Sequence, residues 1–383
     1  MKIIWMGVLM LIVVSCNRNP ESGIIKDKNH KQTLLFEIVN SRRSGIDFGN
    51  EIVETPEMNG FNYMNYNNGA GVAVADFNKD GLQDIYFLST LGNNALYLNK
   101  GNMHFEDVSE ESGSGQMKGL HTGVTAVDIN SDGWTDIYVC LSGPYEEPEM
   151  RRNKLLVNQG LNRNGIPTFK EESSKYGLDL DFCSTQAAFF DYDLDGDLDM
   201  FLVNNSPDLN ALKIENIEVY LHTKSTITAD RFFINQDGKY VDISEKAGMV
   251  NNSLIMGLGL GVSDLNNDGW PDVYVCTDFL GQDALYLNNQ DGTFTESSHQ
   301  SLKHMTYSSM GNDLADFNND GWTDIFTNEM MAEDNYTIKI SAESMNPAFF
   351  HRIADLGLHQ QFRYNTLQMN QDRKSTRLNS SHR

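Results

Sequence analysis

Five copies of one acidic motif, Asp-x-Asp/Asn-x-Asp-Gly-x-x-Asp, recur along the chain. They begin at Asp76, Asp128, Asp191, Asp264 and Asp316, and successive starts are 52, 63, 73 and 52 residues apart. Side-chain oxygens at positions 1, 3 and 5 of this motif can converge on one point, because the glycine at position 6 permits a sharp turn. A Ca²⁺ ion takes about six to eight oxygen ligands in a flexible cage. The motif therefore predicts a calcium-binding loop, in which position 7 offers its backbone carbonyl and the aspartate at position 9 closes the site.

The predicted loop differs from an EF-hand, which needs a glutamate at position 12 and two flanking helices. Position 12 holds Phe87, Val139, Leu202, Val275 or Thr327, each within or at the end of a predicted β-strand. We therefore expect an EF-hand-like ligand loop placed inside a β-hairpin. The alternative is a set of Asp/Asn/Gly turns without an ion, which would leave at least three carboxylates close together at each site with no neutralising charge.

Short β-strands are expected on both sides of each loop. In the first repeat a small, apolar run at 71–75 precedes the loop and a β-rich run at 85–88 follows it, and a second predicted hairpin spans 95–99 and 105–108. Each repeat thus supplies about four strands in about 50–70 residues, the size of one propeller blade. We expect an all-β fold, a β-propeller of four-stranded blades with about five blades present. The small residues before each loop would form a crowded innermost strand.

Three insertions interrupt the repeat pattern, at 143–152, 206–229 and 329–364. The last insertion is expected to contain a helix. Asn346 would cap this helix, Pro347 would take its first position and Gly357 would end it. Its apolar face would be formed by Phe349, Phe350, Ile353 and Leu356.

The loops and their flanking strands resemble the FG-GAP or VCBS repeats of integrin-type β-propellers, over residues 45–370. The resemblance implies up to five bound Ca²⁺ ions and a binding or adhesion scaffold. Propellers of this family commonly have seven blades, and many bacterial members continue into an ASPIC/UnbV-type domain. By motif position, the implied metal ligands are Asp76, Asn78, Asp80, Leu82, Asp84, Asp128, Asn130, Asp132, Trp134, Asp136, Asp191, Asp193, Asp195, Asp197, Asp199, Asp264, Asn266, Asp268, Trp270, Asp272, Asp316, Asn318, Asp320, Trp322 and Asp324.

The two ends of the chain are expected to lie outside the fold. Residues 1–15 have a positive start and an apolar core, and they resemble a bacterial lipoprotein signal peptide that would leave Cys16 lipidated; an ordinary signal peptide is the alternative. Residues 16–44 would form a tether and lead-in, and 45–371 the propeller. Residues 372–383 resemble the translation of a sequencing adaptor, so we expect a non-native tail, a truncated fifth blade and an incomplete ring. The expected location is the cell envelope, as an outer-membrane lipoprotein.

The composition and the motifs of the sequence argue against some classes of function. A formal net charge of −24 argues against a nucleic-acid binder, which needs a basic face, while 40% hydrophobic residues suffice for a core. The sequence contains no His-Glu-x-x-His, Gly-x-Ser-x-Gly or Walker motif. Cys140 and Cys276 occupy equivalent predicted strand positions and are expected to be core thiols. Cys183 has no evident partner in the sequence.

Two functions remain open after this reading. The favoured one is a non-enzymatic scaffold that binds a glycan or protein ligand and meets the membrane only through its lipid anchor. The alternative is a carbohydrate-active enzyme such as a polysaccharide lyase, as in some related propellers, with its site on a propeller face. A convergence of Lys, Arg, Tyr or His side chains on one face would favour the enzyme. Candidate contacts, for which ordinary packing or surface roles are favoured, are Tyr145, Glu146, Glu147, Glu171, Glu172, Tyr192, His351 and His359.

Overall fold

The computed structural model separates the chain into two units, Met1–Val39 and Asn40–Arg383. It describes residues 36–56, 58–143, 147–206, 213–279, 281–330, 334, 336–337 and 347–371. The described part of the first unit, residues 36–39, has no regular element. The fold described below is that of the second unit.

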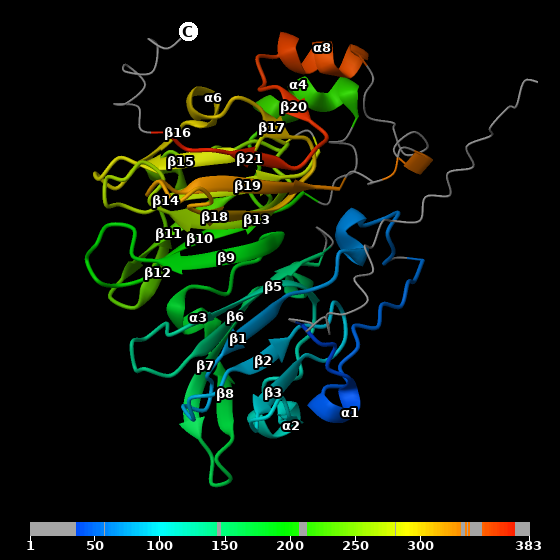
Figure 1. Cartoon of the computed structure of the whole chain (residues 1–383), viewed down its shortest axis with the longest axis vertical. Helices are drawn as coiled ribbons and strands as arrows, with labels where there is room; N and C mark the ends of the chain where they lie inside the picture. Colours follow the sequence, from blue (N-terminus) through cyan, green and yellow to red (C-terminus); the bar gives the residue numbers. More distant parts are fainter. Residues whose placement is uncertain are drawn as a thin grey trace, which may run out of the picture. The chain divides into compact units, whose positions relative to one another are not determined.

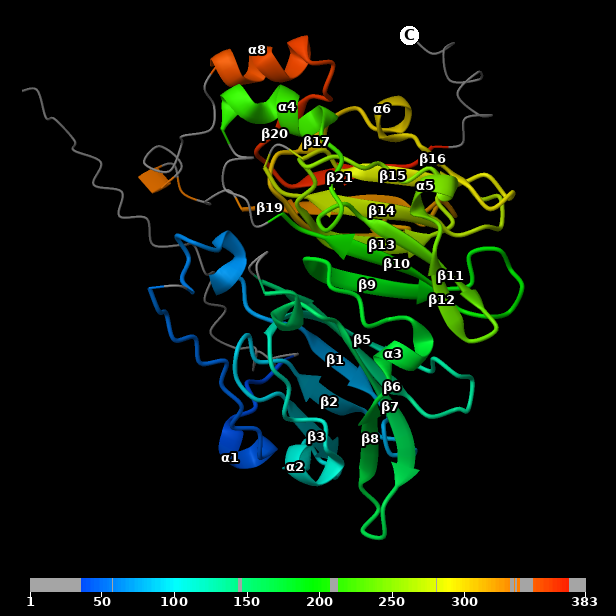
Figure 2. The same ribbon diagram turned by 180° about the vertical axis from the view of Figure 1, so that it is seen from behind.

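Four four-stranded antiparallel sheets follow one another in chain order (Figures 1 and 2). Each sheet is one blade, and in each blade the strands pair in sequence order. Blade 1 contains β1 (Val72–Ala75), β2 (Asp84–Phe87), β3 (Ala95–Asn99) and β4 (Phe105–Asp107). Blade 2 contains β5 (Leu120–Val127), β6 (Asp136–Ser142), β7 (Lys154–Leu161) and β8 (Pro167–Glu171). Blade 3 contains β9 (Ser184–Phe190), β10 (Asp199–Asn204), β11 (Arg231–Gln236) and β12 (Lys239–Asp242). Blade 4 contains β13 (Gly257–Ser263), β14 (Asp272–Thr277), β15 (Ala284–Asn288) and β16 (Phe294–Glu296).

A fifth sheet, blade 5, has three strands within the described residues. Its order is β18 (Ser309–Ala315), β19 (Asp324–Glu329) and β21 (Thr366–Gln368). Beside it, β17 (Met305–Thr306) pairs in parallel with β20 (Gln361–Phe362). The expected all-β class with four-stranded blades is therefore confirmed.

The first strand of each blade lies against the first strand of the next, from β1 through β5, β9 and β13 to β18. These inner strands are crowded. A Cβ atom on Gly123 would lie 2.1 Å from the carbonyl oxygen of Thr185, and one on Gly259 would lie 2.8 Å from the Cα atom of Gly311. The prediction that small residues mark a crowded innermost strand is confirmed.

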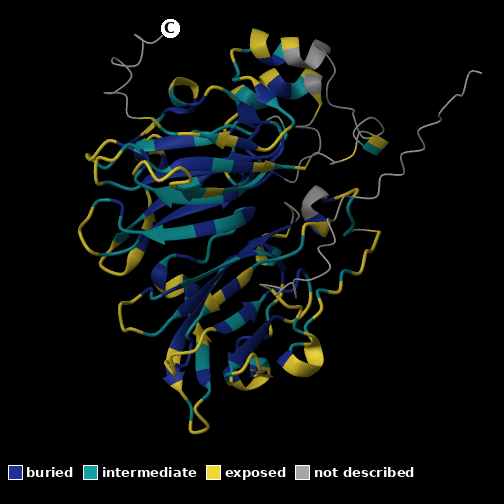
Figure 3. Ribbon diagram, in the orientation of Figure 1, coloured by how far each residue is buried: buried dark blue, intermediate teal, exposed yellow. Residues whose placement is uncertain are grey.

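The core consists of apolar layers between neighbouring blades (Figure 3). Alternation along a strand sends successive side chains to opposite faces of its sheet. In β6, Ile137 and Val139 therefore pack toward blade 1, whereas Tyr138 and Cys140 pack toward blade 3. Because both faces are covered, all of β6 is buried.

Helices are short and lie outside the sheets. One-turn helices follow the fourth strand of each complete blade, namely α2 (Ser109–Ser112), α3 (Ser173–Tyr176), α5 (Ser244–Ala247) and α6 (Ser298–Ser301). Other helical elements within the described residues are α1 (Ser41–Ser44), α4 (Ile217–His222), α8 (Pro347–Asp355), η1 (Met64–Asn67), η2 (Pro148–Met150) and η4 (Ile214–Asn216).

The helix expected in the last insertion is present as α8, which begins at Pro347. After it Gly357 adopts a φ of 71° and donates its N–H to the carbonyl of Ala354. Ile353 is buried with Ile217 of α4 and Leu254. The expected cap Asn346 lies outside the described residues, as do the side chains of Phe349 and Phe350.

Candidate metal centres

Each of the five acidic motifs forms the connection between the first and second strands of its blade. The loops join β1 to β2, β5 to β6, β9 to β10, β13 to β14, and β18 to β19. The predicted placement of the ligand loop inside a β-hairpin is thus confirmed for all five motifs.

The aspartate at position 1 organises the turn in every loop. In the first loop, one carboxylate oxygen of Asp76 accepts the N–H of Asp80 at 3.1 Å and the other accepts the N–H of Gly81 at 2.8 Å. The glycine at position 6 has a φ between 81 and 96° in the five loops, a region that favours glycine. The same two hydrogen bonds are accepted by Asp128, Asp191, Asp264 and Asp316.

The aspartate at position 5 holds the residue at position 7, whose backbone carbonyl is the predicted ligand of the ion. One carboxylate oxygen of Asp132 accepts the N–H of Trp134 at 2.7 Å, and Asp268 holds Trp270 in the same way at 3.0 Å. The equivalent bonds form at Leu82, Asp197 and Trp322. The residue at position 7 is therefore tied to the same turn that carries the acidic side chains. This placement is what coordination through its backbone carbonyl would require.

The side chain at position 3 is hydrogen-bonded in some loops and has an unpartnered oxygen in others. Asn78, Asn130 and Asn318 donate their amide N–H to the position 5 carboxylate at 2.8–3.0 Å. In the third and fourth loops, by contrast, Oδ1 of Asp193 and Oδ1 of Asn266 are buried without a hydrogen-bond partner. An unpartnered buried oxygen is costly unless a donor or cation satisfies it.

The third loop concentrates the most negative charge. Carboxylate oxygens of Asp191, Asp193 and Asp195 lie within 4.8 Å of one another. Burial, with help from the neighbouring acidic groups, raises the pKa of both Asp193 and Asp197. A hard cation with oxygen ligands would neutralise this cluster, so the donor set fits Ca²⁺.

The aspartate at position 9 is buried in every loop and ties the loop to its blade. In the second loop, Asp136 accepts the N–H of Ile129 at 3.0 Å and the N–H of Asn158 at 2.7 Å. Burial is the main cause that raises the pKa of Asp136 to about 6 and that of Asp199 to about 7. Each carboxylate oxygen has more than one acceptor site, so these bonds are compatible with the predicted closing ligand.

An asparagine in the third strand or just after it completes each loop, and the motif did not predict it. Its N–H donates to position 9 in all five blades, from Asn99, Asn158, Asn235, Asn288 and Asn370. In three blades its side chain also reaches the preceding blade, where the carbonyl acceptors are those of Phe77, Tyr192 and Leu265. The repeated Ala-Leu-Tyr-Leu-Asn at 95–99 and 284–288 was the available signal.

Neighbouring loops also touch each other directly. The ammonium group of Lys79 in the first loop lies 4.1 Å from the ring centroid of Trp134 in the second. Asn267 in the fourth loop donates to the carbonyl of Gly321 in the fifth at 3.2 Å. The residues of the acidic loops thus form one connected edge in blades 1 and 2 and another in blades 4 and 5.

Several of the other candidate ligand contacts take part in packing, hydrogen bonds or ion pairs within the fold. Tyr192 is buried between blades 3 and 4, Glu171 caps α3 through Ser173, and Glu172 pairs with Lys170 and Lys175. His359 packs on His299 and hydrogen-bonds the carbonyl of Leu302. Glu147 is exposed, while Tyr145 and Glu146 lie outside the described residues.

The described cysteines are buried thiols. Cys140 and Cys276 occupy equivalent positions in β6 and β14, and burial raises the pKa of both thiols. Cys183 is also a free, buried thiol. The expectation of core thiols is confirmed for Cys140 and Cys276, and Cys16 lies outside the described residues.

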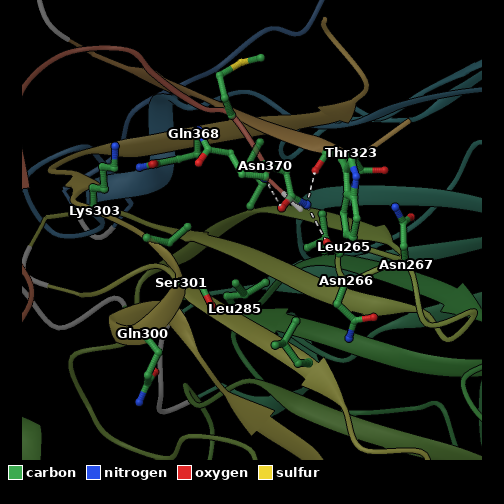
Figure 4. Close-up of a pocket in the computed structure, with 16 residues that line it drawn as sticks. Leu265, Asn266, Asn267, Leu285, Gln300, Ser301, Lys303, Thr323, Gln368 and Asn370 are labelled. Carbon is green, nitrogen blue, oxygen red and sulfur yellow. Dashed lines mark hydrogen bonds between the residues drawn. The ribbon is translucent and has the colours of Figure 1, made fainter. Parts of the chain in front are cut away.

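A pocket of about 760 Å³ lies between blades 4 and 5 (Figure 4). Its walls are mainly aliphatic and amide side chains, with Lys303 and Trp322 among them. Of the Lys, Arg, Tyr and His types, this lining contains Lys303. None of the helices in the described ranges is long and apolar enough to cross a bilayer.

Comparison with known proteins bears on the same loops. The model of the FG-GAP-like repeat matches residues 76–139 and 264–327. Cartilage acidic protein 1 of Xenopus tropicalis is 27% identical over 208 residues, which cover 50% of this chain and 31% of that protein, so the chain spans under a third of that relative's length. A GH43 β-1,3-galactosidase structure with galactodeoxynojirimycin matches with a TM-score of 0.33 and 12% identity, over 69% of this chain and 86% of that one, a similarity too low to support an inference. Two stretches of the chain, 76–139 and 264–327, are therefore similar to FG-GAP-like repeats.

Proposed function

We propose that the chain is a calcium-stabilised β-propeller scaffold that binds a glycan or protein ligand. The observation that carries this proposal is the repetition of one loop geometry in five blades, in which the carboxylates at positions 1, 5 and 9 accept the same backbone hydrogen bonds each time. A single catalytic ion would need only one such loop. Five equivalent loops are what a stabilising role requires, because each can fix its own blade.

A bound Ca²⁺ ion would neutralise the negative charge of the loop that holds it. The chain's own residues fold the turn, aim the oxygens of positions 1, 3 and 5 inward and anchor position 9 in the blade. The unpartnered oxygens of Asp193 and Asn266 support this proposal, since a cation would satisfy both of them. The proposed count is up to five ions, one for each loop.

Calcium titration tests the proposal directly. We expect the melting temperature to fall in a chelator and to recover with Ca²⁺, because an ion that binds only the folded chain stabilises it by about 2.7 kcal/mol per site at a hundredfold excess over Kd. Mg²⁺ at the same concentration is the control, because it demands octahedral geometry and gives up its waters reluctantly. An unchanged melting curve, together with no heat of binding in calorimetry, would show that the loops are ion-free turns.

Ligand binding requires a separate measurement. We propose screening the calcium-loaded chain against arrays of acidic and neutral glycans, with the chelated chain as the control. A scaffold is expected to bind one glycan class reversibly and to leave it chemically unchanged. Release of shortened or unsaturated sugar products would instead establish the lyase alternative.

We further propose that Cys16 carries a lipid anchor that holds the chain at the outer membrane. The support comes from sequence alone, since a short apolar signal ends at this cysteine and a polar segment follows it. Metabolic labelling with a fatty-acid analogue should mark the wild-type chain and not Cys16→Ser. Equal labelling of the two would refute the anchor while leaving the calcium proposal untouched.

A further inference from the structure

The helices of two insertions, α4 and α8, lie side by side (Figures 1 and 2). Ile217 of α4 and Ile353 of α8 are buried together with Leu254, and Arg352 forms an ion pair with Glu218. After α8 the chain returns to the sheets, where β20 pairs with β17. The segment between α8 and β20 therefore connects the α4–α8 pair to the propeller.

Two histidines meet where this segment passes blade 4. His299 belongs to α6, the one-turn helix that follows the last strand of blade 4, and His359 lies between α8 and β20. Their ring centroids are 4.9 Å apart, and the ring planes differ by 32°. The fold thus brings two imidazole groups together from distant segments of the chain.

The hydrogen bonds of the pair determine which ring nitrogen carries the proton. A carbonyl oxygen only accepts, so Nε2 of His359 donates to the carbonyl of Leu302 at 3.0 Å. The carbonyl of His359 accepts the side-chain amide of Gln282 at 3.2 Å, which leaves Oε1 of Gln282 as the acceptor for Nε2 of His299 at 3.2 Å. In the neutral form of each ring, Nδ1 therefore keeps its lone pair.

This arrangement is typical of imidazoles that bind a metal ion. A metal-ligating histidine almost always donates its other ring N–H to a carboxylate, a backbone carbonyl or water, which orients the ring. No described residue donates a hydrogen bond to Nδ1 of His299 or of His359. Imidazole nitrogen suits Zn²⁺, Cu²⁺ and Ni²⁺, whereas Ca²⁺ prefers oxygen ligands.

The histidine pair borders a small acidic pocket. His299 lines a cavity of about 180 Å³, and Gln282, Asp283 and Glu296 line it as well. Carboxyl groups in these walls favour a cation nearby. The next residue of α6, Gln300, instead lines the larger pocket between blades 4 and 5. The pair is therefore formed by described residues of blade 4 and of the segment after α8.

We propose that Nδ1 of His299 and Nδ1 of His359 bind one divalent transition-metal ion of the Zn²⁺ class. In the described part of the chain, the third-loop aspartates are the only three possible ligands found within 4.8 Å of one another, so water completes the coordination at the histidines. The ion fastens the segment after α8 to blade 4 and thereby holds the α4–α8 pair in place. The inference goes beyond the proposed scaffold function and does not require that the loops bind calcium.

Zinc titration of the whole, untagged chain tests this site. The titration is made in saturating Ca²⁺, which competes for the carboxylate loops. We expect one Zn²⁺ per chain at the histidines by isothermal titration calorimetry, and binding at least about tenfold weaker in His299→Gln and in His359→Gln. His222→Gln removes an exposed histidine of α4 and should bind zinc as the wild type does.

The contrary outcomes of the titration are distinct. Zinc affinity that neither His299→Gln nor His359→Gln changes, or an equal loss in His222→Gln, would overturn the site. Wild-type binding weaker than about 1 mM would overturn it as well. Zinc bound by acidic loops that fail to hold calcium would be the same in all four proteins, so failure of the calcium proposal is distinguishable.

Two further measurements test the geometry and the fastening. Gln282→Ala keeps both ligands but removes the amide that orients them, and it should weaken zinc binding about tenfold. Zinc should also slow amide hydrogen exchange in α8 of the wild type and leave it unchanged in His299→Gln. Because His299 is exposed, this variant should melt at the wild-type temperature without zinc. Equal slowing in both proteins would overturn the proposed fastening.

Discussion

Asn288 donates its side-chain amide to the backbone carbonyl of Tyr192 at 2.8 Å, although the two residues belong to neighbouring blades. The backbone N–H of Asn288 binds Asp272 at position 9 of its own loop, and its amide also reaches the carbonyl of Pro271. One buried asparagine thus joins the acidic loop of blade 4 to that of blade 3. Asn158 and Asn370 make the same connection for blades 2 and 5.

Asn288→Ala should lower the free energy of unfolding by about 1–3 kcal/mol, because it leaves buried carbonyls without a donor. Denaturant unfolding in saturating calcium measures the change. The matched control is Asn289→Ala, since Asn289 is exposed and its side chain bonds only within its own hairpin. Similar losses in the two variants would show that the inter-blade bond adds no stability.

The crowding of inner strands gives a second prediction. Gly123→Ala would place a methyl group 2.1 Å from the Thr185 carbonyl, so β5 and β9 would have to separate. Overpacking of this kind costs about 1–3 kcal/mol. Gly49→Ala is the control, because nothing lies within 4 Å of the added methyl group there. Equal melting temperatures for the two variants would contradict close inter-blade packing at Gly123.

The repeated loops and strands, and one helix in an insertion, were the elements that the sequence could predict. The five loops, the small inner-strand residues and α8 each follow from local rules about turns, periodicity and caps. Helix α4 was not expected, because its burial depends on Ile217 meeting Leu254 and Ile353 from distant segments. The linking role of Asn288 was missed for the same reason, since its acceptor Tyr192 lies 96 residues away.

The third loop should bind calcium most tightly, because Asp193 and Asp197 add negative charge that the ion neutralises. Asp193→Asn should weaken binding at this loop, and the reciprocal Asn266→Asp should strengthen the fourth loop. Both residues have a buried oxygen without a partner, so the two changes occur in matched surroundings. Calorimetric titration of the variants measures the shifts. If Asp193→Asn did not change the affinity of the tightest calcium site, negative charge would not determine the order of calcium affinities among the loops.

Buried Asp230 should make stability fall as pH rises. Burial raises the pKa of Asp230 to about 7, so the folded chain holds a proton that the unfolded chain has released above about pH 4. The free energy of unfolding therefore decreases between about pH 4 and pH 7. Asn94 and Asn153 take the equivalent place in blades 1 and 2, where each accepts a backbone N–H just as Asp230 does.

Asp230→Asn should reduce this pH dependence and leave the chain at least as stable as wild type at pH 8. Part of the dependence should remain, because burial also raises the pKa of Asp278 and Asp283 to about 6. Urea unfolding from pH 5 to pH 8 in saturating calcium provides the measurement. Asp291→Asn, at an exposed hairpin position, is the control and should follow the wild-type curve. If Asp230→Asn showed the same dependence of unfolding free energy on pH as the wild type, Asp230 would be excluded as a source of that dependence.

Tryptophan emission should report calcium at three of the five loops. Trp134, Trp270 and Trp322 all occupy position 7, where the N–H is held by the position 5 aspartate and the carbonyl is the predicted ligand. Loss of the ion frees this carbonyl and loosens the residue that carries it. Leu82 and Asp197 stand at position 7 of the first and third loops, which should therefore be nearly silent.

Two variants separate the contributions of these indoles. Asp268→Ala disrupts the fourth loop and should remove mainly the Trp270 share of the calcium response. Lys79→Gln removes the cation that lies 4.1 Å from the Trp134 ring, so it should change the baseline emission while leaving the calcium response of the fourth and fifth loops intact. Emission is recorded during calcium titration of the chelated chain, with calorimetry in parallel. Calcium uptake at these loops with flat emission would mean that position 7 does not coordinate the ion.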